Sequence, residues 1–203
     1  MRGSFRQAPV GRRGVVAARA WRGGKASAGT TLLELLCAMC VVGILAALAV
    51  PSLGSLVLQY RAQGLAQAFV NSVQLARSEA IHRNARVLLC KSLDGVACAA
   101  TGGYEQGWLV FQDANGNGAL DAGEAVIQVQ GMPPGPLRLY GNGPVANYIS
   151  FNGMGLPKML TGEFQAGTLI LCGRQSGQVS TRHIVLSKPG NVRTERTDLA
   201  QCG

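Results

Sequence analysis

Between Thr30 and Val50 the chain has 21 residues, and Glu34 is the only one of them that carries a charge. As an α-helix, this segment is about 31 Å long, which is enough to cross the hydrocarbon core of a bilayer. A carboxylate in such a helix costs about 2.5–3.5 kcal/mol at the centre and less near the end. The segment therefore predicts a transmembrane helix whose carboxylate has a partner and a specific role.

The residues before this segment are strongly basic. Residues 1–29 hold seven lysines and arginines and no acidic residue, within a chain of formal net charge +9. Removing these seven from the 19 basic residues leaves 12 against 10 acidic residues, a net charge of +2. A basic segment that precedes an apolar one stays on the cytoplasmic side of the membrane. The charge of the whole chain therefore does not indicate nucleic-acid binding.

The boundary between the two segments reads Gly29-Thr30-Thr31-Leu32-Leu33-Glu34. This motif resembles the N-terminus of type IV pilins and pseudopilins. In that family, prepilin peptidase cuts after the glycine, the new N-terminus is methylated, and the glutamate at mature position five guides subunits into a fibre. The resemblance implies that Gly29 and Thr30 flank the processing site, that residues 1–29 are a cleaved leader, and that Glu34 acts in fibre assembly. The family usually has phenylalanine where this chain has Thr30.

A different class of protein stays open. Ala47-Leu48-Ala49 has the small-x-small pattern of an ordinary secretory cleavage site after an apolar region. Cleavage there would leave a secreted or membrane-anchored binding domain that is not part of a fibre. This alternative does not explain why a carboxylate stands inside the apolar region.

After the apolar segment, polar residues recur every three or four positions opposite an apolar stripe. The polar residues are Gln59, Gln63, Gln67, Asn71, Gln74 and Ser78, and the stripe consists of Leu65, Phe69, Val73, Ala76 and Ala80. This pattern predicts an amphipathic half-helix over residues 51–85, continuous with the transmembrane half over residues 30–50. Together they predict one helix of about 80 Å with a kink at Pro51.

From Arg86 onwards the chain has eight short strand-like segments with Gly, Pro and Asn between them. They are residues 86–91, 107–112, 125–130, 137–140, 148–152, 168–172, 182–187 and 192–194. Short strands without intervening helices predict an antiparallel sheet. The predicted fold class is α+β and pilin-like, with the long N-terminal helix packed on a β-rich domain over residues 86–203.

Four downstream motifs narrow the resemblance. They are residues 107–118 with 121–124, residues 149–155, Leu171-Cys172-Gly173, and Ile184-Val185-Leu186-Ser187 followed by Gly190. They are similar to motifs of GspH/FimT-type minor pilins and pseudopilins. The resemblance implies a single-pass inner-membrane protein with a periplasmic domain, which later joins a fibre. Its implied partners are other major and minor pilins or pseudopilins, prepilin peptidase and the inner-membrane assembly platform. We favour a type IV pilus minor pilin, with a type II secretion pseudopilin of the GspH type as the alternative.

The six cysteines fall into two groups. Cys37 and Cys40 lie in the apolar segment, where we interpret them as small packing residues. The other four allow three pairings, of which we favour Cys90–Cys98 across a short turn and Cys172–Cys202 at the C-terminus. Two disulfides would place this part of the chain in an oxidising compartment such as the periplasm.

Residues 113–124 allow two interpretations. The oxygen-bearing side chains fit the spacing of a calcium-binding loop, and they are Asp113, Asn115, Asn117, Asp121 and Glu124. The flanking segments predict strands, whereas an EF-hand has helices, and Asn-Gly steps also suit a plain hairpin turn. We expect a loop without a cofactor, with calcium as the alternative.

Enzymatic chemistry has no support in the pattern. The only histidines are His82 and His183, and no serine, cysteine or carboxylate stands at a known catalytic spacing from them. The sequence therefore predicts a protein that is not an enzyme.

The C-terminal region is locally basic, with a net charge of +3 over residues 174–203. Some relatives in the family that the chain resembles bind DNA during natural transformation through a Gly-Arg-x-Arg motif. Here the matching residues are Gly190-Asn191-Val192-Arg193, so Asn191 replaces the first arginine. The candidate DNA-binding residues are Arg182, Lys188, Arg193 and Arg196. The alternative is that these side chains keep a strand edge soluble and discourage edge-to-edge pairing.

Overall fold

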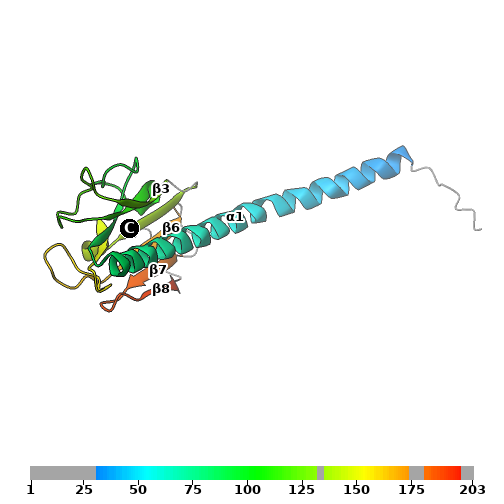
Figure 1. Ribbon diagram of the computed structural model, residues 1–203. Helices are drawn as coiled ribbons and strands as arrows, with labels where there is room; N and C mark the ends of the chain where they lie inside the picture. Colours follow the sequence, from blue (N-terminus) through cyan, green and yellow to red (C-terminus); the bar gives the residue numbers. More distant parts are fainter. Residues whose placement is uncertain (1–30, 132–134, 174–180, 198–203) are drawn as a thin grey trace, which may run out of the picture. The chain divides into compact units, whose positions relative to one another are not determined.

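The computed structural model describes residues 31–131, 135–173 and 181–197, and within them it leaves out the side chains of residues 48–52. The chain divides into two units, Met1–Ile44 and Leu45–Gly203, and each is described by itself. The helix α1 covers Leu32–Arg83. The strands are β1 (Val87–Lys91), β2 (Gly107–Gln112), β3 (Val126–Gly131), β4 (Leu137–Gly141), β5 (Tyr148–Phe151), β6 (Gly167–Gly173), β7 (Thr181–Leu186) and β8 (Val192–Thr197). Two short 3-10 helices, η1 (Tyr104–Gln106) and η2 (Gly143–Val145), complete the elements (Figure 1).

In the first unit, the described residues are the start of α1. Leu32, Leu33, Leu35 and Leu36 are exposed there. Among the residues that the structure describes, no helix is both long enough and apolar enough to cross a membrane. Part of the predicted segment over residues 30–50 lies outside the described residues, as do the leader and the side chain of Pro51.

In the second unit, α1 is two-faced, as its sequence period predicts. The apolar stripe is buried, and it includes Leu65, Phe69, Val73, Ala76 and Ala80. The polar residues Gln59, Gln63 and Gln67 are exposed on the helix. The stripe packs on apolar side chains of both sheets in one cluster, so the helix and the sheets share one hydrophobic core.

The strands form two four-stranded antiparallel sheets, in the orders β3-β2-β1-β5 and β4-β6-β7-β8. In the first sheet, Leu89 of β1 lies between Val110 of β2 and Ile149 of β5. In the second sheet, β7 lies between β6 and β8, and β8 is an edge strand. All eight predicted strands are confirmed, with ends that shift by one residue in most cases and with β8 longer than predicted.

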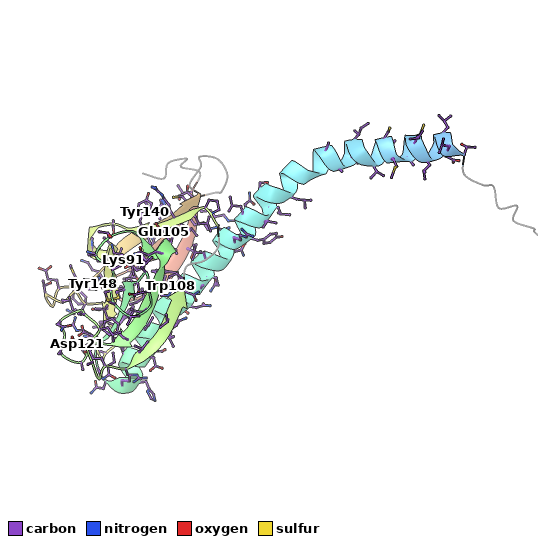
Figure 2. The ribbon with its side chains drawn as sticks, turned by 90° about the horizontal axis from the view of Figure 1, so that it is seen from above. Lys91, Glu105, Trp108, Asp121, Tyr140 and Tyr148 are labelled. Atoms are coloured by element: carbon purple, nitrogen blue, oxygen red, sulfur yellow. A yellow bond between two sulfur atoms is a disulfide. The ribbon has the colours of Figure 1, made fainter. Side chains whose placement is uncertain are left out.

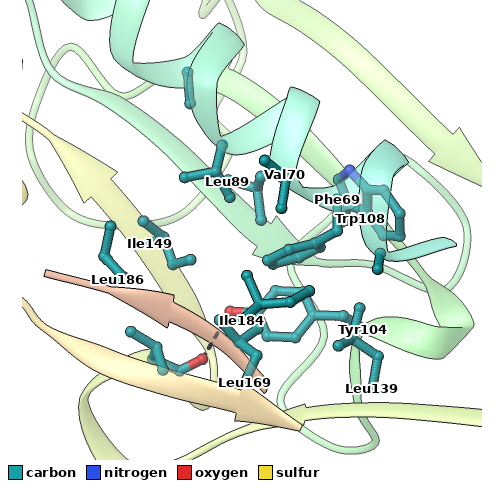
Figure 3. Packing of buried hydrophobic residues seen from close by; sticks show 14 of the residues in the cluster. Phe69, Val70, Leu89, Tyr104, Trp108, Leu139, Ile149, Leu169, Ile184 and Leu186 are labelled. Carbon is teal, nitrogen blue, oxygen red and sulfur yellow. Dashed lines mark hydrogen bonds between the residues drawn. The ribbon is translucent and has the colours of Figure 1, made fainter. Parts of the chain in front are cut away.

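Aromatic rings fill the centre of the shared core. The ring of Phe69 on α1 meets Tyr104 edge to face at a centroid distance of 5.0 Å, and Trp108 at 5.3 Å. Figure 3 shows these rings with Leu139, Leu169 and Ile184 around them. Burial raises the pKa of Tyr104, so its hydroxyl stays protonated and donates a hydrogen bond to the Val145 carbonyl at 3.0 Å.

The first sheet also has an apolar second face. Leu88 and Cys90 of β1 pack there with Leu109 and Phe111 of β2. Tyr148 of β5 and the loop residues Cys98, Leu120 and Leu160 cover this face. Because both faces are covered, every residue of β1 is buried, and the strand reads as a continuous apolar run with a terminal lysine.

Candidate functional site: the helix start, the loops and the basic strand edge

The first site is the start of α1. The Oγ1 atom of Thr31 accepts a hydrogen bond from the backbone N–H of Glu34 at 3.3 Å. Thr31 therefore caps the helix, and the carboxylate of Glu34 stands in the first turn, where the helix dipole favours negative charge. Glu34 is exposed. The role of Thr31 was missed in the sequence, although Thr-x-x-Glu before an apolar run is a signal of a helix start. Gly29 and Thr30 lie outside the described residues.

The second site is the cysteine-closed turn after β1. The predicted bond between Cys90 and Cys98 is confirmed. Inside this turn, the Oδ1 atom of Asp94 accepts hydrogen bonds from the N–H groups of Val96 and Ala97, which lower the pKa of the Asp94 carboxyl. The turn is thus closed by one covalent bond and organised by one carboxylate.

The other cysteines have different states. Cys172 is also disulfide-bonded, but its predicted partner Cys202 lies outside the described residues, so that pairing stays a prediction. Cys37 and Cys40 are free and exposed.

The loop over residues 113–124 is held by its own side chains. Asp113 is buried, and its carboxylate accepts hydrogen bonds from the N–H groups of Gly116, Asn117 and Gly118. The amides of Asn115 and Asn117 both donate to the Oδ2 atom of Asp121, at 2.8 and 2.7 Å, and they lower the pKa of that carboxyl. Figure 2 shows Asp121 at the periphery of the domain.

The last carboxylate of the loop closes it. The side chain of Glu124 accepts hydrogen bonds from the N–H groups of Ala114 and Asp121. The oxygens that would ligate calcium therefore already accept N–H donors of the same loop. Within the described residues, no group of three or more His, Cys, Asp or Glu side chains is placed to hold a metal ion. The expected loop without a cofactor and its calcium alternative both stay open.

The basic residues near the C-terminus do not form one patch. In β8, side chains alternate between the two faces of the sheet, so Arg193 and Arg196 point to opposite sides. Arg193 lies opposite Val185 and pairs with Glu195 of its own strand, whereas Arg196 lies directly opposite Arg182 of β7. Lys188 is exposed in the turn between the two strands. The structure therefore places Arg182 with Arg196 and separates both from Arg193.

Arg182 is the unexpected member of this group. Its side chain is only 9% exposed, and burial, with a contribution from Arg196, lowers the pKa of its guanidinium. Sequence alone did not indicate this burial, because an arginine in an alternating strand normally faces water.

The two histidines lie in different elements, His82 in α1 and His183 in β7. His82 is exposed in the last turn of α1. The Nδ1 atom of His183 lies 3.5 Å from the Oγ1 atom of Thr197 across the β7–β8 pair. This contact links the inner strand β7 to the edge strand β8.

Comparison with known proteins agrees with this geometry. A sequence model of the family described as type II transport protein GspH matches residues 65–190. The chain is 37% identical over 179 residues to the pilin-like protein PilA1 of Thermus thermophilus, which covers 82% of this chain and 97% of that protein.

Two solved structures align with about two thirds of this chain. The type IV minor pilin FimU of Pseudomonas aeruginosa aligns with a TM-score of 0.47 at 18% identity, over 66% of this chain and 87% of FimU. The minor pseudopilin EpsH of the type 2 secretion system of Vibrio cholerae aligns with a TM-score of 0.46 at 16% identity, over 67% of this chain and 97% of EpsH.

A long helix packed on two antiparallel sheets, with a carboxylate in its first turn, defines the pilin-like class of proteins. Within that class, the chain belongs to the GspH family. Its relative in Thermus thermophilus is itself described as a pilin-like protein.

Proposed function

We propose that the chain is a minor pilin of a type IV pilus and that it acts as a structural subunit and not as an enzyme. Prepilin peptidase cuts the Gly29–Thr30 bond and methylates Thr30, and the subunit then leaves the inner membrane for the fibre through the assembly platform. The observation that carries this proposal is Glu34, an exposed carboxylate at the capped start of a helix whose neighbouring side chains are apolar and exposed.

The mechanism is association through the helix. Before assembly, the apolar first part of the helix anchors the subunit in the inner membrane, with the β-rich domain over residues 86–203 in the periplasm. In the fibre, the exposed leucines around Glu34 pack on helices of adjacent subunits. The carboxylate then pairs with the free amine at the N-terminus of a neighbour, which offsets the cost of keeping a charge in an apolar environment.

A type II secretion pseudopilin is the second candidate, and the match to the GspH family model supports it. The relative in Thermus thermophilus is named a pilin-like protein, which supports the first candidate. Both candidates share the processing step and the role of Glu34. Deleting the gene separates them, because loss of pili with normal secretion supports the first, and loss of secretion with normal pili supports the second.

A role in DNA uptake is a finer part of the proposal. Lys188 and Arg193 are exposed at the turn and edge of the second sheet, and Arg196 is exposed on the other face of β8. Such residues contact phosphates without reading sequence, so binding would weaken with salt.

The experiment that tests the main proposal is mass spectrometry of the N-terminus after purification from the native host. A methylated N-terminus at Thr30 is the expected result. A mature N-terminus at Val50 would instead indicate the secreted or anchored binding domain that follows ordinary signal cleavage, and it would overturn the proposal.

A further inference from the structure

A polar pocket of about 220 Å³ lies between α1 and the end of the β7–β8 pair. Leu56, Gln59, Tyr60 and Gln63 line it from the helix, and Arg182 and Arg196 line it from the strands. All six residues belong to the second unit. Neither the packing of the hydrophobic core nor the resemblance to pilins explains why two arginines line this pocket.

The two arginines face each other with no acidic partner among the described residues. They are direct cross-strand neighbours, and like charges in this position repel. Arg182 is 9% exposed, and within the described part of the chain its buried Nε atom has no hydrogen-bond acceptor. A buried polar group without a partner is costly, and a buried charge costs more. Among the described residues these two guanidinium groups thus have no anionic partner, and an anion in the pocket would supply one.

Among the described residues, no carboxylate is placed to pair with Arg182 or Arg196. Glu195 lies on the opposite face of β8, where it pairs with Arg193. The helix has no acidic residue between Glu34 and Glu79. Asp198 follows β8 in the sequence but lies outside the described residues.

The groups that line the pocket suit a phosphate. Guanidinium groups present N–H donors in a planar fork that matches two phosphate oxygens, and two of them together offset more than one negative charge. The amides of Gln59 and Gln63 and the hydroxyl of Tyr60 supply neutral donors at the rim. The volume admits a phosphate group with part of the molecule that carries it.

The position of the pocket along the helix indicates where such a phosphate comes from. From Leu35 to Leu58 the helix has no charged residue and no side-chain amide, and Gln59, Tyr60 and Arg61 are the first polar group after it. Tyrosine is enriched at the headgroup layer of a membrane, and an arginine beside it can extend its charge into that layer. Leu53, Leu56 and Val57 are exposed just before this point, so the apolar surface of the helix continues up to the pocket.

We propose that Arg182 and Arg196 form a phosphate-binding pocket, and that the headgroup of an anionic phospholipid occupies it while the subunit is in the membrane. The lipid source rests on the proposed membrane anchoring, whereas phosphate binding does not. The bound headgroup holds the β-rich domain over residues 86–203 close to the bilayer, and extraction into the fibre breaks this contact.

The test uses the full chain in two settings. In detergent micelles, calorimetric titration with inorganic phosphate measures the pocket alone. In nanodiscs of phosphatidylcholine with or without phosphatidylglycerol, native mass spectrometry counts the anionic lipids that stay bound. Arg182→Gln with Arg196→Gln is the test variant, and Lys188→Gln with Arg193→Gln is the matched control, because it removes the same charge from the turn and the other face of β8.

We expect the test variant to bind phosphate about tenfold or more weakly and to lose retained phosphatidylglycerol, with the control unchanged. Thermal melting checks folding, and Arg196→Gln alone, at an exposed position, replaces the double variant if that one unfolds. Phosphate binding without lipid retention supports the pocket and assigns the phosphate to solution, even if the anchoring proposal fails.

Three results overturn the inference, and a fourth refutes its lipid source. The first is no phosphate binding by the native chain, and the second is equal weakening in the test and control variants, which would indicate only net charge. The third is phosphate binding that appears only in Asp198→Asn, which would show that the chain's own carboxylate fills the pocket. Displacement of phosphate by duplex DNA but not by lipid would assign the pocket to DNA uptake and would also refute the lipid headgroup.

Discussion

The backbone N–H of Glu34 donates a hydrogen bond to the hydroxyl of Thr31, so the carboxylate proposed to direct fibre assembly stands in the capped first turn of α1. This bond satisfies one of the N–H groups that have no acceptor at a helix start. The next N–H, that of Leu35, donates to the Thr31 carbonyl at 3.1 Å, so regular helical hydrogen bonding begins at Thr31.

Replacing Glu34 should therefore affect assembly and leave the fold intact. We expect Glu34→Leu to be exported and cleaved normally but to reach sheared fibres in reduced amounts, because the intersubunit ion pair is lost. Immunoblots of fibre and membrane fractions measure this. Glu163→Leu, which removes an exposed carboxylate from the β-rich part, is the control. Normal fibre levels of Glu34→Leu would refute the pairing role.

Phe69 should be the most sensitive position of the interface between helix and sheets. It is fully buried and contacts both Tyr104 and Trp108. Phe69→Ala should lower the free energy of unfolding by about 3–5 kcal/mol, since it leaves a cavity among rings. Gln67→Ala, on the exposed face, should change it by about 0.5 kcal/mol or less. Denaturant titration followed by tryptophan fluorescence compares the two, and equal effects would contradict the described core.

The Cys90–Cys98 bond should stabilise the chain measurably. In the loop-entropy model, a bridge over this short segment contributes about 2.5 kcal/mol, which Cys90→Ser with Cys98→Ser should remove. Denaturant titration without reductant measures the loss. The hydrogen bonds of Asp94 should survive in the variant, so the turn should stay formed but exchange its amide protons faster.

The pairing of Cys172 has its own test. Non-reducing peptide mapping should find Cys172 linked to Cys202 and should find Cys37 and Cys40 as free thiols. By the same model the longer loop contributes about 3–4 kcal/mol. A peptide that links Cys90 to Cys172 would contradict both the prediction and the bond seen in the structure.

The hydrogen bonds of Asp121 in the loop over residues 113–124 should make the stability of the fold depend on pH. The pKa of Asp121 is lowered by the amides of Asn115 and Asn117, so the folded state binds this proton less tightly than the unfolded state. The contribution to stability is present above the unfolded pKa of about 3.9 and is lost as the pH falls through the folded value. Asn115→Ala with Asn117→Ala should return the pKa of Asp121 to its ordinary range in an NMR titration, with Asp94 as the unchanged control. Addition of calcium to the native chain should leave these signals in place, and large shifts would support the calcium alternative.

DNA binding, where it occurs, should be weak and sensitive to salt. Each phosphate contact releases counterions, so a few exposed arginines and lysines give affinities in about the micromolar range that fall steeply with salt. Arg193→Ala with Lys188→Ala should reduce binding of duplex DNA in a low-salt titration, and Gln67→Ala should not. Binding that survives the double substitution would place the site elsewhere. No binding at low salt would favour the solubility role of this strand edge.

The sequence alone determined the long helix and the eight strands of this protein and the order in which they occur. The period of the apolar residues predicts α1 and its buried stripe, because one face of a helix must leave water. Gly, Pro and Asn between alternating segments predict all eight strands, and the short spacing of Cys90 and Cys98 predicts their bond. These features depend on residues that are neighbours in the chain, so local patterns suffice for them.

Only the tertiary structure decided how distant residues meet. Nothing in the spacing of Arg182 and Arg196 shows that β7 and β8 pair in a register that sets them opposite each other, or that α1 brings Gln59 and Gln63 beside them. The sequence did not predict that the eight strands divide into two sheets. It also did not predict that Arg193 and Arg196 lie on opposite faces of β8. A shift of one residue in the register of β8 would reverse both faces, and that register is set by the turn over residues 187–191 together with the burial of one face of the sheet.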